Sequence, residues 1–240
     1  MRWLGLFLLF LPFSGTSQEA ASQEITAVNY KDFSVGLNFN TSGWGVAFDF
    51  GIQKTYKYKQ LFGFTFTNIR HEKEYKIYSG GNVTRGYYFG KLNSLVSFRP
   101  VYGGKALIFK AQRENGIEIS LKWSIGPSIG FLKPVYLRID NLSSTITTDE
   151  KYDPSIHSTA NITSRSSYFK GFFEGRIKPG AFGKIGFDFN FAALRKGISG
   201  GEIGIITDYF PQDLIILHAN EGVNLFTSFY LQFNLGQKLY

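Results

Sequence analysis

The sequence predicts an all-β protein, an up-and-down antiparallel transmembrane β-barrel of about eight strands, with ten strands as the alternative. The chain of 240 residues contains 25 Phe, 14 Tyr and 27 Gly but one Met, and this composition suits strands better than helices. Several segments alternate bulky and small or polar residues with period 2. Beyond the first residues, no apolar run approaches the roughly 20 residues that a membrane helix requires.

The alternation is clearest in residues 44–53, 117–125, 184–191 and 229–235, and weaker in residues 33–40, 60–70, 92–101 and 202–209. A period of 2 places every second side chain on the same face of a strand. One face is bulky, and we expect it to contact lipid. Its clearest members are Trp44, Val46, Phe48, Phe50, Ile119, Leu121, Trp123, Phe187, Phe189, Phe191, Leu231 and Phe233.

The opposite face combines small residues with charged and amide residues. A soluble β-sandwich also alternates, and remains the alternative, but its solvent-facing side has no need to be rich in glycine. In a narrow barrel, small residues relieve crowding and charges pair across the interior. We expect a closed polar lumen here, although the same charges would also suit a conducting or proton-relaying path. The charged residues are Asp49, Arg99, Glu118, Lys122, Asp188 and Glu202.

The connections fit a barrel with two different ends. Short polar turns are expected at residues 57–59, 110–115 and 195–201 on one side, and long connections at residues 71–90 and 141–165 on the other. Residues 167–179 are ambiguous, since they suit either a loop helix or an added hairpin that would give ten strands. The terminal strand carries a candidate signal for the barrel-assembly machinery, namely Phe229, Leu231, Phe233, Leu235 and Tyr240.

The N-terminus has the three parts of a signal peptide in order. Arg2 is followed by an apolar run over residues 4–13 and by small residues up to Ser17. We expect cleavage after Ser17, or alternatively after Ala20, leaving residues 18–240 as a single barrel domain. The chain has no cysteine, which excludes a lipoprotein anchor, disulfides and thiolate metal sites.

Six segments of the chain suggest a family resemblance: TNIRHEKE (67–74), GKLNSLVSFRPVYGGK (90–105), GPSIGFLKPVYL (126–137), KPGAFGKIGFDF (178–189), EIGIITDYFP (202–211) and the terminal FYLQFNLGQKLY. They resemble conserved, largely uncharacterised outer-membrane β-barrel proteins of the Bacteroidota. The resemblance covers most of the chain from about residue 60 onward. It implies an outer-membrane location and supplies no catalytic residues.

Motifs for chemistry are few. We find no phosphate-binding glycine loop, paired histidines at metal spacing or nucleophile elbow, and expect no metal and no cofactor. The three histidines, His71, His157 and His218, fall in connections on the outer side. Asp208, Asp149 or Asp153 could orient one of them as a base, with a serine or a water as nucleophile. A rim-catalytic hydrolase or acyltransferase is therefore the runner-up function.

The net charge of +8 and the pI near 9.5 call for anionic partners. Basic residues spread along strands and turns of an exported chain do not predict nucleic-acid binding. Outer-membrane lipid, the phosphates of lipopolysaccharide and an envelope protein complex fit better. We expect a non-enzymatic structural or accessory barrel of the bacterial outer membrane, with a small-solute pore as a further alternative if the barrel has more strands.

Overall fold

The computed structural model describes residues 31–78, 86–111, 116–140, 147–191, 197–218 and 222–239. The predicted signal peptide, its cleavage site and Tyr240 lie outside these residues. No helix in the described part is long and apolar enough to cross a membrane.

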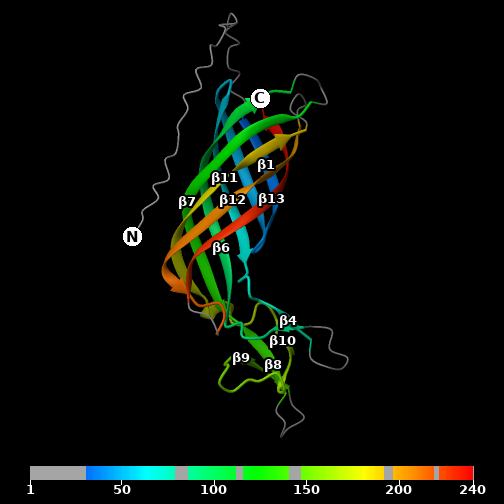
Figure 1. The fold of residues 1–240 in the computed structure, drawn as a ribbon, viewed down its shortest axis with the longest axis vertical. Helices are drawn as coiled ribbons and strands as arrows, with labels where there is room; N and C mark the ends of the chain where they lie inside the picture. Colours follow the sequence, from blue (N-terminus) through cyan, green and yellow to red (C-terminus); the bar gives the residue numbers. More distant parts are fainter. Residues whose placement is uncertain are drawn as a thin grey trace, which may run out of the picture.

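Eight antiparallel strands close into a barrel in the order β1-β13-β12-β11-β7-β6-β3-β2 (Figure 1), which confirms the predicted fold class. β1 pairs with β13 from Lys31 opposite Leu239 to Asn40 opposite Tyr230, so the first and last strands complete the ring. The strands are β1 (Lys31–Asn40), β2 (Gly43–Thr55), β3 (Tyr58–Ile69), β6 (Asn93–Phe109), β7 (Glu118–Pro134), β11 (Arg176–Asn190), β12 (Gly197–Leu214) and β13 (Val223–Leu239).

The two ends of the barrel differ as expected. Short connections join β2 to β3, β6 to β7 and β11 to β12 at one end, here called the turn end. The predicted turn at residues 195–201 is partly wrong, because β12 already begins at Gly197, which lies opposite Gln237. β13 continues to Leu239, and β12 pairs with it as far as Gln237, which satisfies backbone groups that a longer turn would leave unpaired.

At the other end, the loop end, the long connections fold into a small module beyond the barrel (Figure 1). Its strands are β4 (Lys76–Ile77) paired with β5 (Tyr87–Tyr88), and β8 (Tyr136–Asp140) lying between β9 (Thr147–Lys151) and β10 (Ile162–Arg165). The ambiguous residues 167–179 hold a single 3₁₀ turn, η1 (Phe172–Glu174), before β11 begins. They add no hairpin, so the barrel has eight strands.

The module has an apolar core of its own. Tyr87, Leu137, Ile139, Tyr152 and Ile162 are buried together, so two connections that are distant in sequence share one core. Backbone hydrogen bonds attach the module to the third connection: Leu92 N–H donates to Ile216 O, and His218 N–H donates to Gly90 O. The module and the β12–β13 connection together form a folded platform at the loop end.

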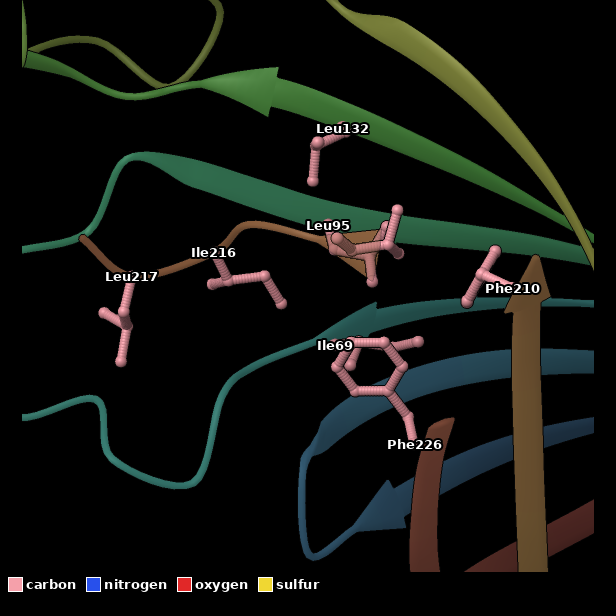
Figure 2. Packing of buried hydrophobic residues seen from close by; sticks show 8 residues of the cluster. Ile69, Leu95, Leu132, Phe210, Ile216, Leu217 and Phe226 are labelled. Carbon is pink, nitrogen blue, oxygen red and sulfur yellow. The ribbon is translucent and has the colours of Figure 1, made fainter. Parts of the chain in front are cut away.

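Inside the barrel, a second apolar cluster fills the loop end. Figure 2 shows Ile69, Leu95, Leu132, Phe210 and Phe226 converging from different strands, with Ile216 and Leu217 from the β12–β13 connection. This corrects the expectation of a polar lumen, which holds only for part of the barrel's length. The strands continue past the polar region, and inward side chains capped by a connection are shielded from water, so apolar residues are favoured there.

Candidate functional site

Charged residues gather in the barrel interior near the turn end. Lys122 Nζ lies 2.6 Å from an Asp49 oxygen and 2.9 Å from Glu202. Lys184 Nζ binds the other Glu202 oxygen at 2.9 Å, and the Tyr230 hydroxyl donates to that oxygen at 2.7 Å. Glu202 is therefore the centre of a hydrogen-bonded ionic cluster that links opposite walls of the barrel.

Nearer the turn end, Asp188 pairs with Lys105 and Asp32 pairs with Lys59. Glu118 is the exception among the predicted lumen residues. It is only partly buried and lines a small cavity with Lys105 at the mouth of the interior. The other predicted lumen residues, Asp49, Arg99, Lys122, Asp188 and Glu202, are buried.

A second ionic group lies closer to the loop end. The Arg99 guanidinium donates to both carboxylate oxygens of Asp208, from Nε at 2.7 Å and from Nη2 at 2.6 Å. Thr67 accepts from Arg99 at 2.8 Å, and Ser128 donates to Asp208 at 2.8 Å. All three guanidinium nitrogens of Arg99 and both carboxylate oxygens of Asp208 thus have a hydrogen-bond partner, which favours a buried ion pair.

Apolar layers enclose the Arg99–Asp208 group on both sides. Phe182, Ile206 and Tyr230, with Val101, separate it from the Glu202 cluster. The apolar cluster of Figure 2 lies on its other side. The interior is thus built of successive filled layers, which is the geometry of a packed barrel core.

Small residues on the inner face are explained by this packing. A Cβ added at Gly186 would lie 2.3 Å from the Tyr230 hydroxyl oxygen, and at Gly204 it would lie 2.1 Å from Ile185 O. Both distances are far below van der Waals contact. This crowding is what the glycine-rich inward faces of the strands predict for a narrow barrel.

The predicted lipid-facing residues lie on the outer surface. Trp44, Phe187, Phe191, Leu231 and Phe233 are exposed. The remaining seven, Val46, Phe48, Phe50, Ile119, Leu121, Trp123 and Phe189, are partly exposed on the same face. The candidate assembly residues Phe229, Leu231, Phe233 and Leu235 also face outward on β13.

Two of the three proposed catalytic aspartates, Asp208 and Asp149, pair with cations instead of a histidine, whereas Asp153 lies beside His157 through its backbone N–H. Asp208 is inside the barrel and pairs with Arg99, so its assignment as a partner of an outer histidine is wrong. Asp149 pairs with Arg138 and Lys170. These carboxylates bind cations because a permanent positive charge close by gives a stronger interaction than a neutral imidazole does.

Two histidines occupy structural positions at the loop end, His157 in the module and His218 in the β12–β13 connection. His157 is buried, its Nδ1 accepts from Asp153 N–H at 3.0 Å, and its Nε2 lies 3.3 Å from Glu150. His218 is exposed, and its backbone N–H binds Gly90 O. Neither contacts a serine hydroxyl in the described residues.

His71 lines a cavity of about 220 Å³ at the loop-end rim, together with Ser42. Its Nδ1 accepts from Lys73 N–H, while the Ser42 hydroxyl is hydrogen-bonded to the Ser228 hydroxyl. The base–nucleophile hydrogen bond that the rim-enzyme alternative requires is therefore not formed by this pair. Within the described part of the chain, no three His, Cys, Asp or Glu side chains group as a metal site.

Neither family models nor curated proteins match the chain. Among solved structures, Ail, the attachment invasion locus protein of Yersinia pestis, is 10% identical over 88% of this chain and 97% of its own, with TM-score 0.38. Neisserial surface protein A is 8% identical over 88% and 95%, with TM-score 0.36. A major outer membrane protein from Thermus thermophilus is 9% identical over 88% and 100%, with TM-score 0.47.

These likenesses concern the fold alone. The resemblance to outer-membrane proteins of the Bacteroidota stays a prediction.

Sequence reasoning missed part of the interior network. Lys105 lies beyond the predicted segment 92–101, although it continues the odd-numbered inward parity of Arg99. Asp208 has the same parity as Glu202 on β12, and that signal could have placed it inside the barrel.

Proposed function

We propose that this chain is a non-enzymatic barrel of the bacterial outer membrane that anchors a folded loop-end platform, which binds envelope partner proteins or lipid. One observation carries the proposal: every strand of the barrel presents large apolar side chains to the outside. One exposed example from each strand is Phe39, Trp44, Phe64, Tyr102, Ile125, Ile185, Ile203 and Leu231.

A protein dissolved in water rarely exposes a continuous apolar surface of this extent. In a bilayer the same surface is favourable, and a closed barrel leaves no unpaired strand edge in the hydrocarbon. The apolar ring, defined here as the large apolar side chains on the outward faces of the eight barrel strands, is the feature that supports a membrane location.

Orientation follows from the two ends. Barrels of this class have short turns in the periplasm and longer loops outside the cell. The turn end would therefore face the periplasm, and the module with its own core would be extracellular. Rigid scaffolds that support ordered loops are the usual arrangement for binding sites.

The membrane location is tested by cell fractionation and by gel mobility before and after boiling. We expect the chain in the outer-membrane fraction, with folded protein resisting SDS until boiled. Recovery in the periplasm or medium with no heat-dependent mobility shift would refute the proposal.

The platform's role is tested by cross-linking in intact cells followed by mild-detergent purification. The comparison is between the full barrel and a variant with Tyr152→Ala and Ile162→Ala in the module core. We expect a specific partner that is lost from this variant while the barrel keeps its SDS resistance. A partner retained by the variant, or none, would contradict binding through the platform.

A further inference from the structure

A cavity of about 90 Å³ lies where the module meets β3, β6 and β7. Asn68, Ser94 and Lys133 line it from the barrel wall. Their chain neighbours Ile69, Leu95 and Leu132 are buried in the interior cluster. Because side chains alternate along a strand, the cavity residues point to the outside of the barrel.

Four cationic residues converge on this cavity: Arg70, Lys91, Lys133 and Arg165. Lys91 and Lys133 are 7% and 5% exposed. Lys91 Nζ binds Glu74 at 2.6 Å, whereas Lys133 Nζ donates to the carbonyl oxygens of Tyr168 at 2.5 Å and Lys170 at 3.1 Å.

Within the described residues, Glu74 is the one carboxylate bonded to these four cations. The side chains of Arg70 and Arg165 have no carboxylate partner there. Burial lowers the pKa of Lys91, and the charges of Arg70 and Arg165 lower it further, against the opposing effect of Glu74. Such crowding of like charge is unfavourable until an anion enters.

The lining also supplies hydrogen-bond donors suited to an oxyanion. Serine hydroxyls come from Ser94 and Ser167, an amide from Asn68, and phenols from Tyr88 and Tyr168. Guanidinium groups match the geometry of a phosphate, to which they can donate two parallel hydrogen bonds. The volume exceeds that of a single water site several-fold, so a phosphate-sized group fits.

The register places this cavity directly beyond the apolar ring. On β3 and β6, Phe66 lies opposite Phe98 with the ring centroids 4.7 Å apart. Ser94 lies four residues further along β6, which is about 13 Å at the rise of a strand. Strand tilt shortens this to about 10 Å along the barrel axis, and the headgroup layer of one leaflet is about 5–7 Å thick, so a lipid with its headgroup in the cavity would reach Phe66 and Phe98 with its acyl chains.

Exposed aromatic residues lie between the cavity and the apolar ring on the β7 side. Phe172 of η1 packs its ring 5.0 Å from Phe131, an outward residue of β7. Phe169, whose ring lies 6.0 Å from that of the cavity residue Tyr168, is 78% exposed, and Phe173 is fully exposed. Aromatic side chains at this level are typical of a membrane interface.

We propose that this cavity binds the phosphate headgroup of an outer-leaflet lipid, with the acyl chains lying against Phe66, Phe98 and Phe131. The proposal rests on the membrane location argued above. It assigns to the module a lipid site in addition to its exposed protein-binding surface, and it gives a role to the four converging cations.

The test uses the full chain folded in dodecyl maltoside micelles, with dioleoyl phosphatidic acid as the phosphate-bearing probe. Native mass spectrometry would measure the bound lipid against dioleoyl phosphatidylcholine, which has the same acyl chains. We expect one tightly bound phosphatidic acid. The variant Arg70→Gln with Arg165→Gln should bind it about tenfold or more weakly, since each change removes a charge-assisted hydrogen bond.

The matched control is Arg138→Gln with Lys151→Gln, which removes the same charge from exposed module residues outside the cavity. It should bind phosphatidic acid like the unmodified protein. If the cavity variant loses its folded gel mobility, the single variant Arg165→Gln replaces it, and this variant should also bind phosphatidic acid more weakly than the unmodified protein.

Three results would overturn the assignment. These are equal loss of binding in the cavity and control variants, equal affinity for the two lipids, and displacement of phosphatidic acid by an equal concentration of inorganic phosphate. The last would identify a site for soluble phosphate. If any of these results is obtained with protein that keeps its heat-dependent gel mobility, the lipid site is refuted, while the proposed membrane location still holds.

Discussion

The Arg99–Asp208 pair shows how a charge is tolerated inside the barrel. Arg99 is 1% exposed and Asp208 2%, and apolar layers lie on either side. Removing one partner leaves the other charge buried without compensation, whereas replacing both with apolar groups can be nearly neutral. The pair therefore adds little net stability, but each of its two charges requires the other.

We expect Asp208→Asn to lower the free energy of unfolding by about 3–5 kcal/mol. The double variant Arg99→Met with Asp208→Leu should recover most of that loss. Urea unfolding of the barrel in lipid vesicles measures both. Glu118→Gln is the control, because Glu118 is partly exposed at the turn end and its loss should cost less than about 1 kcal/mol. Equal effects of Asp208→Asn and Glu118→Gln would contradict the role of burial.

At the scale of elements, the carboxylates of β9 and the turn after it make the module sensitive to acid. The Thr148 hydroxyl and then His157 lower the pKa of Glu150 through hydrogen bonds. The hydroxyl and backbone N–H of Ser155, at 2.6 Å and 2.9 Å, lower the pKa of Asp153. A pKa lower in the folded than in the unfolded state stabilises the fold above the unfolded value, and this stabilisation is lost as the pH falls through the folded value.

We therefore expect the module to loosen below about pH 4, where ordinary Asp and Glu side chains titrate, while the barrel stays closed. Hydrogen exchange, corrected for its intrinsic pH dependence, should show falling protection of residues 147–165 relative to β12. Ser155→Ala should shift this loss to higher pH. Unchanged protection of the module at pH 3 would show that these bonds do not hold it.

The apolar ring gives a prediction for a barrel strand. Ile185 is 53% exposed on the outward face of β11, and Ile156 is 68% exposed in the module. In a bilayer, Ile185→Lys should cost about 2–4 kcal/mol of unfolding free energy. The same change at Ile156 should stay within about 0.5 kcal/mol, as on a water-exposed surface.

Unfolding in vesicles measures both lysine variants. Similar small effects at the two positions would mean that the ring contacts water, and the proposed membrane location would then be wrong.

At the scale of the whole molecule, the interior is filled layer upon layer from the Glu202 cluster to the apolar cluster at the loop end. Eight strands enclose a space only wide enough for side chains. The pore alternative required a barrel with more strands, and this barrel has eight.

We expect no steady unitary conductance when the folded protein is inserted into planar bilayers. Protease cleavage of the exposed module on one side of the bilayer would verify insertion. Reproducible channels from verified insertions would show that the layers open, and would revive the conducting interpretation of the lumen charges.

Features that depend on residues close together in the chain could be predicted from the sequence, and contacts between distant residues could not. Alternation is a local property, so residues such as Trp44 and Phe187 could be assigned to the outside, and Asp49 and Glu202 to the inside, from their neighbours alone. The expectation of about eight strands and the end of the barrel at which the long connections lie followed from the same pattern, whereas the choice between eight and ten strands came from the structure. The partner of each charge did not follow.

The sequence by itself determined the barrel, its two ends and the polarity of its faces, because these depend on period 2 along each strand and on the length of each connection. Only the tertiary structure decided that Asp208 binds Arg99, that two loops build one core, and that Arg70, Lys91, Lys133 and Arg165 share a cavity. Such contacts join residues far apart in the chain, and they are set by strand register and by the packing of the loops over the barrel end.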